Sequence, residues 1–219
     1  MFKAAIFDLD GTLLDSVKDL ENACNFALSK FNLPYVDSQN YKLLLGNGRY
    51  YMVKSIVEKY FSINKEEIIN QFLNYFNTYY KEHMLDNTKP FNEIIELLEE
   101  LEKNNIVTAI LSNKPDDFTK TLVDNIFKNK VKVTYGLRDG YKAKPNPDTL
   151  LDIIDMIKLK KSDCVYIGDT EIDISTARNA NIKSIGVLWG YRSKSLLKQE
   201  GADYIASSVK ELKDIIINN

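Results

Sequence analysis

Short apolar segments typical of buried strands alternate with helical segments over most of this chain. The strand-like segments are residues 3–7, 106–111, 131–135, 164–167, 184–188 and 203–206. Between them, apolar residues recur at the three- and four-residue spacing of helices that bury one face. Strands and helices that alternate in this way predict a parallel β-sheet with helices on both faces, which is an α/β fold.

One long segment departs from this alternation. Between residues 16 and 83 the apolar residues keep helical spacing throughout, as in Leu20, Ala23 and Ala27, and no strand-like run occurs. We therefore expect an inserted helical domain at 16–85, placed as a lid, and an α/β core made of 1–15 and 86–219.

The charge of the chain argues against several kinds of partner. Its 29 Lys and Arg residues and 31 Asp and Glu residues give a net charge of −2, without a dense basic block. Nucleic acids and anionic membranes need clustered positive charge, so neither is expected. No apolar run approaches the roughly 20 residues that cross a bilayer, and the N-terminus lacks a signal-peptide pattern. We expect a cytoplasmic protein that binds a small molecule, and a monomer and a homodimer both remain open.

Polar segments follow three of the predicted strands. They span residues 8–12, 112–113 and 168–173. In an open parallel sheet, ligands bind in the crevice beyond the carboxyl ends of the strands. The three segments can therefore build one site.

The first polar segment carries two aspartates. Asp8 and Asp10 are two positions apart, so in extended backbone their side chains leave on the same side, roughly 6–7 Å apart. Gly11 permits a tight turn, and Thr12 offers a hydroxyl and backbone donors to a phosphate. One carboxylate can attack phosphorus while the other acts first as an acid and then as a base. The alternative is that Asp10 and Gly11 merely form a turn.

The third polar segment is typical of a magnesium site. Asp169 and Asp173 lie about one helical turn apart, and Mg²⁺ prefers one or two carboxylates together with water and phosphate oxygens. A helix cap is the alternative interpretation. Several carboxylates at one edge would repel a phosphate, so cations must lie among them. Mg²⁺ and Lys144, in a loop stiffened by two prolines, are the candidates.

The second polar segment offers hydrogen-bond donors. Ser112 carries a hydroxyl and Asn113 an amide, and both can donate to phosphoryl oxygens during phosphoryl transfer. By itself, a Ser-Asn pair is also an ordinary way to open a loop.

Taken in order, these segments resemble the haloacid dehalogenase superfamily of phosphohydrolases. The shared pattern is Asp-x-Asp-Gly-Thr, then Ser, then Lys, then Gly-Asp-x-x-x-Asp, and the resemblance covers essentially the full chain. It implies a Rossmann-like core with an inserted helical cap domain, and hydrolysis of a phosphomonoester with Mg²⁺ through an aspartyl-phosphate.

The resemblance also implies individual roles. Asp8 would be the nucleophile and Asp10 the general acid and base. Magnesium would be held by Asp8, the Asp10 main-chain carbonyl and Asp169, with Asp173 supporting a metal-bound water. Ser112 and Lys144 would bind the transferring phosphoryl group, with Asn113 close by.

Softer signals indicate a subgroup. Ser112-Asn113-Lys114-Pro115, Gly46-Asn47-Gly48 and Leu188-Trp189-Gly190-Tyr191 are similar to segments of the phosphoglycolate phosphatases. In the predicted cap, Gly48 would let a loop close over the substrate, and Arg49 would grip its carboxylate or second phosphate. A flexible connection and a solvated arginine are the alternatives.

Other members of the superfamily remain as alternatives. Pyrophosphatases and sugar-phosphate phosphatases share versions of these segments. The β-phosphoglucomutases place a His and a Lys where this chain has Leu20 and Pro115, which favours hydrolysis. A non-catalytic phospho-ligand binder would be expected to lose Asp8 or Asp169, and both are present.

Overall fold

The computed structural model describes the whole chain except residues 37–40, 43, 47, 64 and 219. The chain divides into two compact units, one made of residues 1–14 and 90–219 and the other of residues 15–89. None of the helices in the described part of the chain has both the length and the apolar character needed to cross a membrane.

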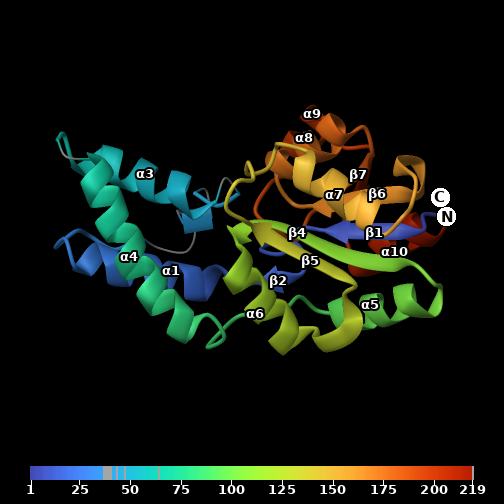
Figure 1. Cartoon of the computed structure of the whole chain (residues 1–219), viewed down its shortest axis with the longest axis horizontal. Coiled ribbons are helices and arrows are strands. Elements are labelled where there is room, and N and C mark those ends of the chain that lie inside the picture. The colour runs from blue at the N-terminus through green and yellow to red at the C-terminus, as the bar shows by residue number, and fades with distance from the viewer. Residues whose placement is uncertain (37–40, 43, 47, 64, 219) are drawn as a thin grey trace. The chain divides into compact units, whose positions relative to one another are not determined.

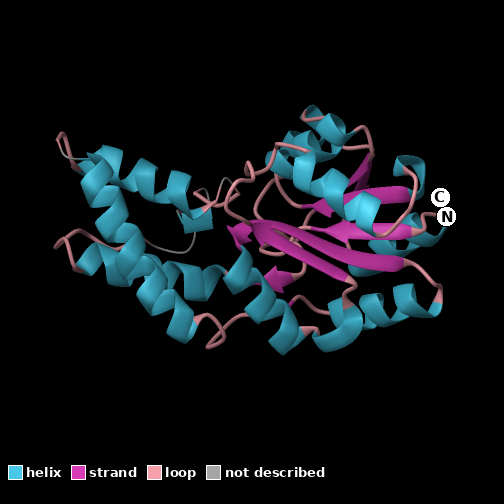
Figure 2. Cartoon of the chain, in the orientation of Figure 1, coloured by secondary structure: helices cyan, strands magenta, loops and turns pink. Residues whose placement is uncertain are grey.

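The larger unit is built on a parallel six-stranded sheet (Figures 1 and 2). Its strand order is β5-β4-β1-β6-β7-β8, so the first strand of the chain lies in the middle. The strands are β1 (Ala4–Phe7), β4 (Val107–Pro115), β5 (Val133–Leu137), β6 (Cys164–Gly168), β7 (Lys183–Val187) and β8 (Tyr204–Ala206). The predicted α/β class with a parallel sheet is confirmed.

The central strand is apolar on both faces because helices cover both sides of the sheet. All four residues of β1 are fully buried, and β1 pairs in parallel with β4 on one side and β6 on the other. On one face, Ala4 and Ile6 pack with apolar residues of α7 (Asp148–Met156) and α8 (Glu171–Ala180).

The remaining helices of this unit complete the two layers. In Figure 1, α5 and α6 lie on the face of the sheet opposite α7 and α8. The bounds of the remaining helices are α5 (Ile94–Lys103), α6 (Asp116–Ile126), α9 (Lys194–Gln199) and α10 (Val209–Asn218). The single-turn 3₁₀ helices are η1 (Lys128–Lys130) and η2 (Lys161–Asp163).

The predicted strand boundary that differs most from the structure is the end of the second strand. The sequence predicts that the second strand ends at residue 111, whereas β4 continues through Ser112 and Asn113 to Pro115. The strand stays paired with β5 after a shift in register between Leu111 and Pro115. The polar segment therefore lies within the end of a strand, where backbone pairing restricts its movement.

The smaller unit is helical, as its apolar spacing indicates. It contains α1 (Val17–Ser29), α3 (Arg49–Tyr60) and α4 (Lys65–His83), and α4 packs against both α1 and α3. The buried side chains of α4 are Ile69, Phe72, Phe76 and Tyr80. Two short strands, β2 (Leu14–Asp15) and β3 (Lys89–Pro90), pair where the chain passes between the units.

Asp19 ties the two ends of the helical unit together. It lies in the first turn of α1 and is almost fully buried. Its carboxylate accepts hydrogen bonds from the main-chain N–H groups of Asn87 and Thr88 and from both of their side chains, at 2.7–3.1 Å. One side chain thus satisfies several donors of the returning segment.

We expect Asp19→Ala to lower the free energy of unfolding by about 2–4 kcal/mol, because it leaves several buried donors without their acceptor. Chemical denaturation followed by circular dichroism would measure the change. Lys18→Ala is the matched control, since Lys18 is 57% exposed and pairs with Glu21 only at 3.7 Å. Its effect should stay within about 0.5 kcal/mol. Equal effects of the two variants would contradict a role for the Asp19 hydrogen bonds.

Candidate active site

Three neighbouring strands of the sheet deliver polar residues to one edge of the larger unit. Asp8 follows β1, Ser112 lies near the end of β4, and Asp169 follows β6. Because β4, β1 and β6 are adjacent and parallel, their carboxyl ends meet at the same edge. The three polar segments therefore meet at one edge of the sheet, as the sequence predicts.

Lys144 lies at the centre of this group. Its ammonium is 2.8 Å from Asp8 Oδ1 and 2.7 Å from Asp173 Oδ1, and it donates to the Tyr166 hydroxyl at 2.9 Å. Only 3% of its side chain is exposed. Burial by itself would lower the pKa of Lys144, but the carboxylates of Asp173 and Asp8 raise it well above its ordinary value. The lysine therefore remains a cation.

Tyr166 completes the surroundings of that ammonium. It is a fully buried residue of β6 whose hydroxyl lies 3.3 Å from Asp173 Oδ1 and donates to the Leu111 carbonyl at 3.1 Å. The sequence did not single it out, because a tyrosine in an apolar strand looks like a core residue. A buried tyrosine hydroxyl needs a hydrogen-bond partner, and this requirement is the one signal in the sequence that could have indicated polar neighbours of Tyr166.

Three buried aspartates form a group suited to a metal ion. Asp8, Asp169 and Asp173 each offer a carboxylate oxygen, and these oxygens lie within 4.8 Å of one another. Burial raises the pKa of Asp8 to about 7, against the lowering effect of Lys144. Burial, followed by the charges of Asp173 and Asp8, also raises the pKa of Asp169 well above its ordinary value. A bound cation would offset this cost and keep the carboxylates ionised.

The charges around the site lead to the same conclusion. Lys114 pairs with Asp10, and Lys144 pairs with Asp8 and Asp173, while the carboxylate of Asp169 lies beside those of Asp8 and Asp173. When all four carboxylates are ionised, the two ammonium groups leave two negative charges uncompensated. Hard carboxylate oxygens and a deficit of this size fit a divalent cation such as Mg²⁺.

Asp169 is held in place by two elements distant in sequence. Its Oδ1 accepts a hydrogen bond from the Thr12 hydroxyl at 3.0 Å, and its Oδ2 accepts one from the Tyr191 main-chain N–H at 2.8 Å. A side chain at Gly11 or at Gly190 would overlap Asp169. These contacts give a physical reason for the glycines.

Thr12 contacts Asp169 in this structure, and its predicted role in phosphate binding stays a prediction. It is completely buried, and its hydroxyl is directed to Asp169. Its carbonyl accepts a hydrogen bond from the Trp189 indole at 3.0 Å. The side chain therefore orients a carboxylate of the site.

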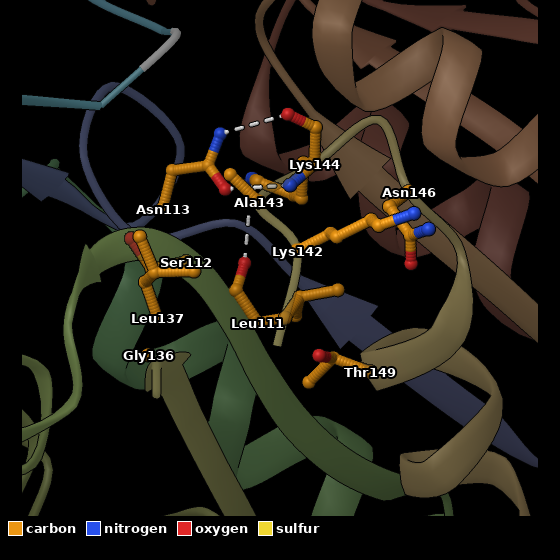
Figure 3. Close-up of a pocket in the computed structure, with 10 residues that line it drawn as sticks. All are labelled: Leu111, Ser112, Asn113, Gly136, Leu137, Lys142, Ala143, Lys144, Asn146 and Thr149. Atoms are coloured by element: carbon orange, nitrogen blue, oxygen red, sulfur yellow. Dashed lines mark hydrogen bonds between the residues drawn. The ribbon is translucent and has the colours of Figure 1, made fainter. Parts of the chain in front are cut away.

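Asn113 likewise acts on another residue of the site. Its amide nitrogen donates to the Lys144 carbonyl at 3.2 Å, and its amide oxygen accepts from the Lys144 N–H at 2.8 Å (Figure 3). This pair of bonds joins β4 to the loop that carries the lysine. Ser112, by contrast, uses its hydroxyl oxygen to accept a hydrogen bond from the Lys114 N–H at 3.2 Å.

A small pocket lies beside this loop, between the ends of β4 and β5 and the start of α7 (Figure 3). Ser112, Asn113 and Lys144 contribute to its wall together with Lys142 and Thr149. In Figure 3 the Lys142 side chain extends toward Asn146. The pocket is thus continuous with residues of the predicted site.

Asp173 caps a helix, as one interpretation of its position predicts, and it also contacts Lys144. Its Oδ2 accepts hydrogen bonds from the Thr170 N–H at 3.0 Å and from the Thr170 hydroxyl at 2.7 Å, and the first of these bonds belongs to a capping box at the start of α8. Its Oδ1 receives Lys144. The helix cap fixes the carboxylate that holds the lysine.

The two residues predicted in the cap belong to the helical unit. Gly48 has φ +84° and precedes α3, and Arg49 is the first residue of that helix. The Arg49 guanidinium donates a hydrogen bond to the side chain of Asn77 on α4. Asn47, from the same predicted loop, lies outside the described residues. Participation of Gly48 and Arg49 in substrate binding stays a prediction.

The fold and the site define an α/β enzyme with clustered aspartates and lysines at the carboxyl edge of a parallel sheet. Over residues 5–187 the sequence matches the haloacid dehalogenase-like hydrolases. A phosphoglycolate phosphatase of Vibrio parahaemolyticus is 30% identical over 222 residues, which cover 98% of this chain and 96% of that protein. The chain belongs to the haloacid dehalogenase-like hydrolase family.

Two other relatives extend the comparison. The crystal structure of a protein from Lactobacillus delbrueckii subsp. bulgaricus superposes on this chain with a TM-score of 0.92. The two sequences are 31% identical, and the superposition covers 100% of this chain and 99% of that one. An N-acetylmuramic acid 6-phosphate phosphatase of Pseudomonas aeruginosa is 28% identical over 216 residues, or 98% of this chain and 94% of that protein. Relatives similar over their full length are thus phosphatases with different substrates.

Proposed function

We propose that this protein is a magnesium-dependent phosphomonoester hydrolase that works through an aspartyl-phosphate, with 2-phosphoglycolate as its substrate. The observation that carries the proposal is the buried Lys144 ammonium between Asp8 and Asp173, next to Asp169. This arrangement supports the proposal, because a carboxylate able to attack phosphorus, a cation able to bind phosphate and carboxylates able to hold a metal ion lie together at one edge of the sheet.

In this proposal the metal site belongs to three residues. Asp8 and Asp169 would supply carboxylate oxygens, and Asp10 would supply its main-chain carbonyl. Asp173 would support a water molecule bound to the metal. When bound, Mg²⁺ would neutralise charge on the phosphoryl oxygens as it builds up during the reaction.

The residues of the chain divide the reaction into two steps. Asp8 attacks phosphorus, the ester P–O bond breaks, and Asp10 gives its proton to the leaving alkoxide. Asp10 then removes a proton from a water molecule, which attacks the aspartyl-phosphate, releases inorganic phosphate and restores Asp8. Lys144 and Ser112 bind the phosphoryl oxygens. Thr12 orients Asp169, and Asn113 orients the loop that carries Lys144.

The substrate is the finer part of the proposal. The relative from Vibrio parahaemolyticus supports phosphoglycolate, and that from Pseudomonas aeruginosa supports a sugar phosphate. Phosphate release should be measured on phosphoglycolate, N-acetylmuramic acid 6-phosphate, other sugar phosphates, nucleotides and pyrophosphate, with Mg²⁺ and with a chelator. A metal-dependent preference for phosphoglycolate supports the full proposal. Preference for another ester rejects the substrate, and a requirement for a sugar bisphosphate indicates a mutase.

We also propose that residues 16–85 form a cap domain that selects the organic part of the substrate. Arg49 is its candidate residue, since a guanidinium binds a carboxylate in a bidentate way. Arg49→Met should raise KM for phosphoglycolate about tenfold or more, because the variant loses one charge-assisted hydrogen bond to the substrate. It should leave KM for p-nitrophenyl phosphate unchanged. Equal changes for both esters would exclude a selective role for Arg49.

Magnesium is expected to stabilise the protein more at pH 8 than at pH 5.5. The folded protein raises the pKa of Asp8 from 3.8 to about 7, so without metal its stability falls as the pH rises between these two values. The ion prefers the ionised carboxylates that appear over the same range. At 100 times its Kd it adds about 2.7 kcal/mol, which corresponds to a rise in Tm of about 5–10 °C.

Differential scanning calorimetry with and without MgCl₂, at matched ionic strength, measures this difference. Asp169→Asn serves as the comparison, because it removes one proposed ligand oxygen and one charge. Its Tm should respond much less to Mg²⁺. A wild-type response that is independent of pH, or larger at pH 5.5, would contradict the metal site.

A further inference from the structure

A second buried lysine contacts the other proposed catalytic aspartate. The Lys114 ammonium lies 3.0 Å from Asp10 Oδ2, and 4% of the lysine side chain and 19% of the aspartate side chain are exposed. The site thus pairs each of the two aspartates with its own lysine, Asp8 with Lys144 and Asp10 with Lys114. In the sequence, Lys114 is part of the segment similar to the phosphoglycolate phosphatases and has no predicted role of its own.

The backbone of Lys114 is fixed from several sides. Its N–H donates to the Ser112 hydroxyl oxygen at 3.2 Å, and its carbonyl accepts from the Thr119 hydroxyl of α6 at 3.2 Å. A Cβ added to Gly136 on β5 would lie 2.5 Å from that carbonyl. Strand, helix and neighbouring strand therefore fix the lysine backbone, while burial of the side chain and the contact with Asp10 restrict the stem and its ammonium.

A general acid must be held within a short range of the atom it protonates. Proton transfer needs heavy atoms about 2.6–3.2 Å apart, whereas an aspartate in a turn can rotate about its side-chain bonds. Asp10 lies at the start of such a turn, where it forms an isolated β-bridge with Leu14 and precedes Gly11 with φ +87°. An ammonium that holds one carboxylate oxygen also sets the direction in which the other oxygen points.

We propose that Lys114 is a positioning residue that orients the Asp10 carboxylate for proton transfer to the leaving group. The inference rests on the proposed function, because it takes Asp10 as the general acid and base. In this arrangement Lys144 serves the phosphoryl end of the reaction and Lys114 serves the leaving-group end. The competing interpretation is that Lys114 binds an anionic group of the substrate directly.

The dependence on the leaving group distinguishes the two interpretations. Lys114→Met keeps the length of the stem and removes the charge. Since an alkoxide needs a proton to leave, kcat/KM for an alkyl phosphate such as phosphoglycolate should fall about 10²-fold, mainly through kcat. p-Nitrophenolate leaves as a stable anion, so the same variant should lose less than about fivefold on p-nitrophenyl phosphate.

Lys120→Met is the matched control. It removes a 50% exposed lysine that pairs with Asp116 on α6, and it should leave both kcat/KM values unchanged. Equal losses of Lys114→Met on the two esters, or a loss confined to the KM for phosphoglycolate, would overturn the positioning role. The second of these results would indicate direct binding of the substrate carboxylate.

A readout independent of activity separates this inference from the proposed function. In a crystal structure of Lys114→Met, the Asp10 carboxylate should leave the position that it has in the wild type, while Asp8 and Lys144 keep theirs. An unchanged Asp10 would overturn the inference even in an active enzyme. A wild-type protein inactive on both esters would reject the proposed function, and the position of Asp10 would still decide whether Lys114 orients it.

Discussion

Replacing Asp8 by asparagine is expected to lower kcat by at least about 10⁴-fold, because an amide cannot form the aspartyl-phosphate and the loss of a nucleophile removes the whole covalent route. The fold should persist. Asparagine has nearly the same shape, and burial already disfavours the charge on Asp8, as its pKa of about 7 indicates. Phosphate release and thermal unfolding would measure the two effects.

A comparison variant makes the Asp8 result specific. Asp163→Asn removes a carboxylate that pairs with an exposed lysine, Lys3, at 3.1 Å outside the site, and should leave kcat unchanged. Acid quenching during turnover should trap a phosphorylated protein in the wild type and in Asp163→Asn but not in Asp8→Asn. Activity of Asp8→Asn near that of the wild type would contradict the assignment of the nucleophile.

The fold was predictable because its main signal is local. Strands buried on both faces are continuously apolar, as β1 is, and helices between them keep helical spacing. The end of β4 was not predictable, because Ser112 and Asn113 look like loop residues. They stay in the strand because β5 pairs with it beyond a shift in register, and that is a tertiary contact.

The acidic part of the site was predictable for a related reason. Asp8, Asp169 and Asp173 follow strands whose carboxyl ends must meet at one edge of the sheet. The hydrogen-bond partners of the site residues were not predictable, because each of these contacts joins residues far apart in sequence. Thr12 lies 157 residues from Asp169, and Asn113 lies 31 residues from Lys144.

Lys114 shows the same limit in its strongest form. A lysine before a proline is typical of a solvated loop, and only the folded chain reveals that 4% of its side chain is exposed. Polar residues that follow a predicted strand can be chosen from the sequence as candidates for the site. Their orientation depends on packing that no local pattern encodes.

Replacing Lys144 by methionine is expected to remove both activity and stability. Loss of the cation that binds the phosphoryl group should lower kcat/KM by about 10³-fold. Without metal, the carboxylates of Asp8 and Asp173 would lose their buried ammonium partner, which costs about 3–5 kcal/mol when one member of a buried ion pair is removed. Phosphate release and denaturation in the presence of a chelator would measure these losses.

The stability of Lys144→Met should depend on pH in a defined direction. Without the ammonium, the pKa of Asp8 rises further above its ordinary value, so the folded variant holds its proton to higher pH and loses stability as the pH increases. The difference from the wild type should therefore be larger at pH 8 than at pH 5. Lys103→Met, which removes a 67% exposed lysine of α5 that pairs with Glu100 outside the site, should show neither effect. If the two lysine variants unfold at the same denaturant concentration at pH 8, the buried ion pairs of Lys144 do not support the fold.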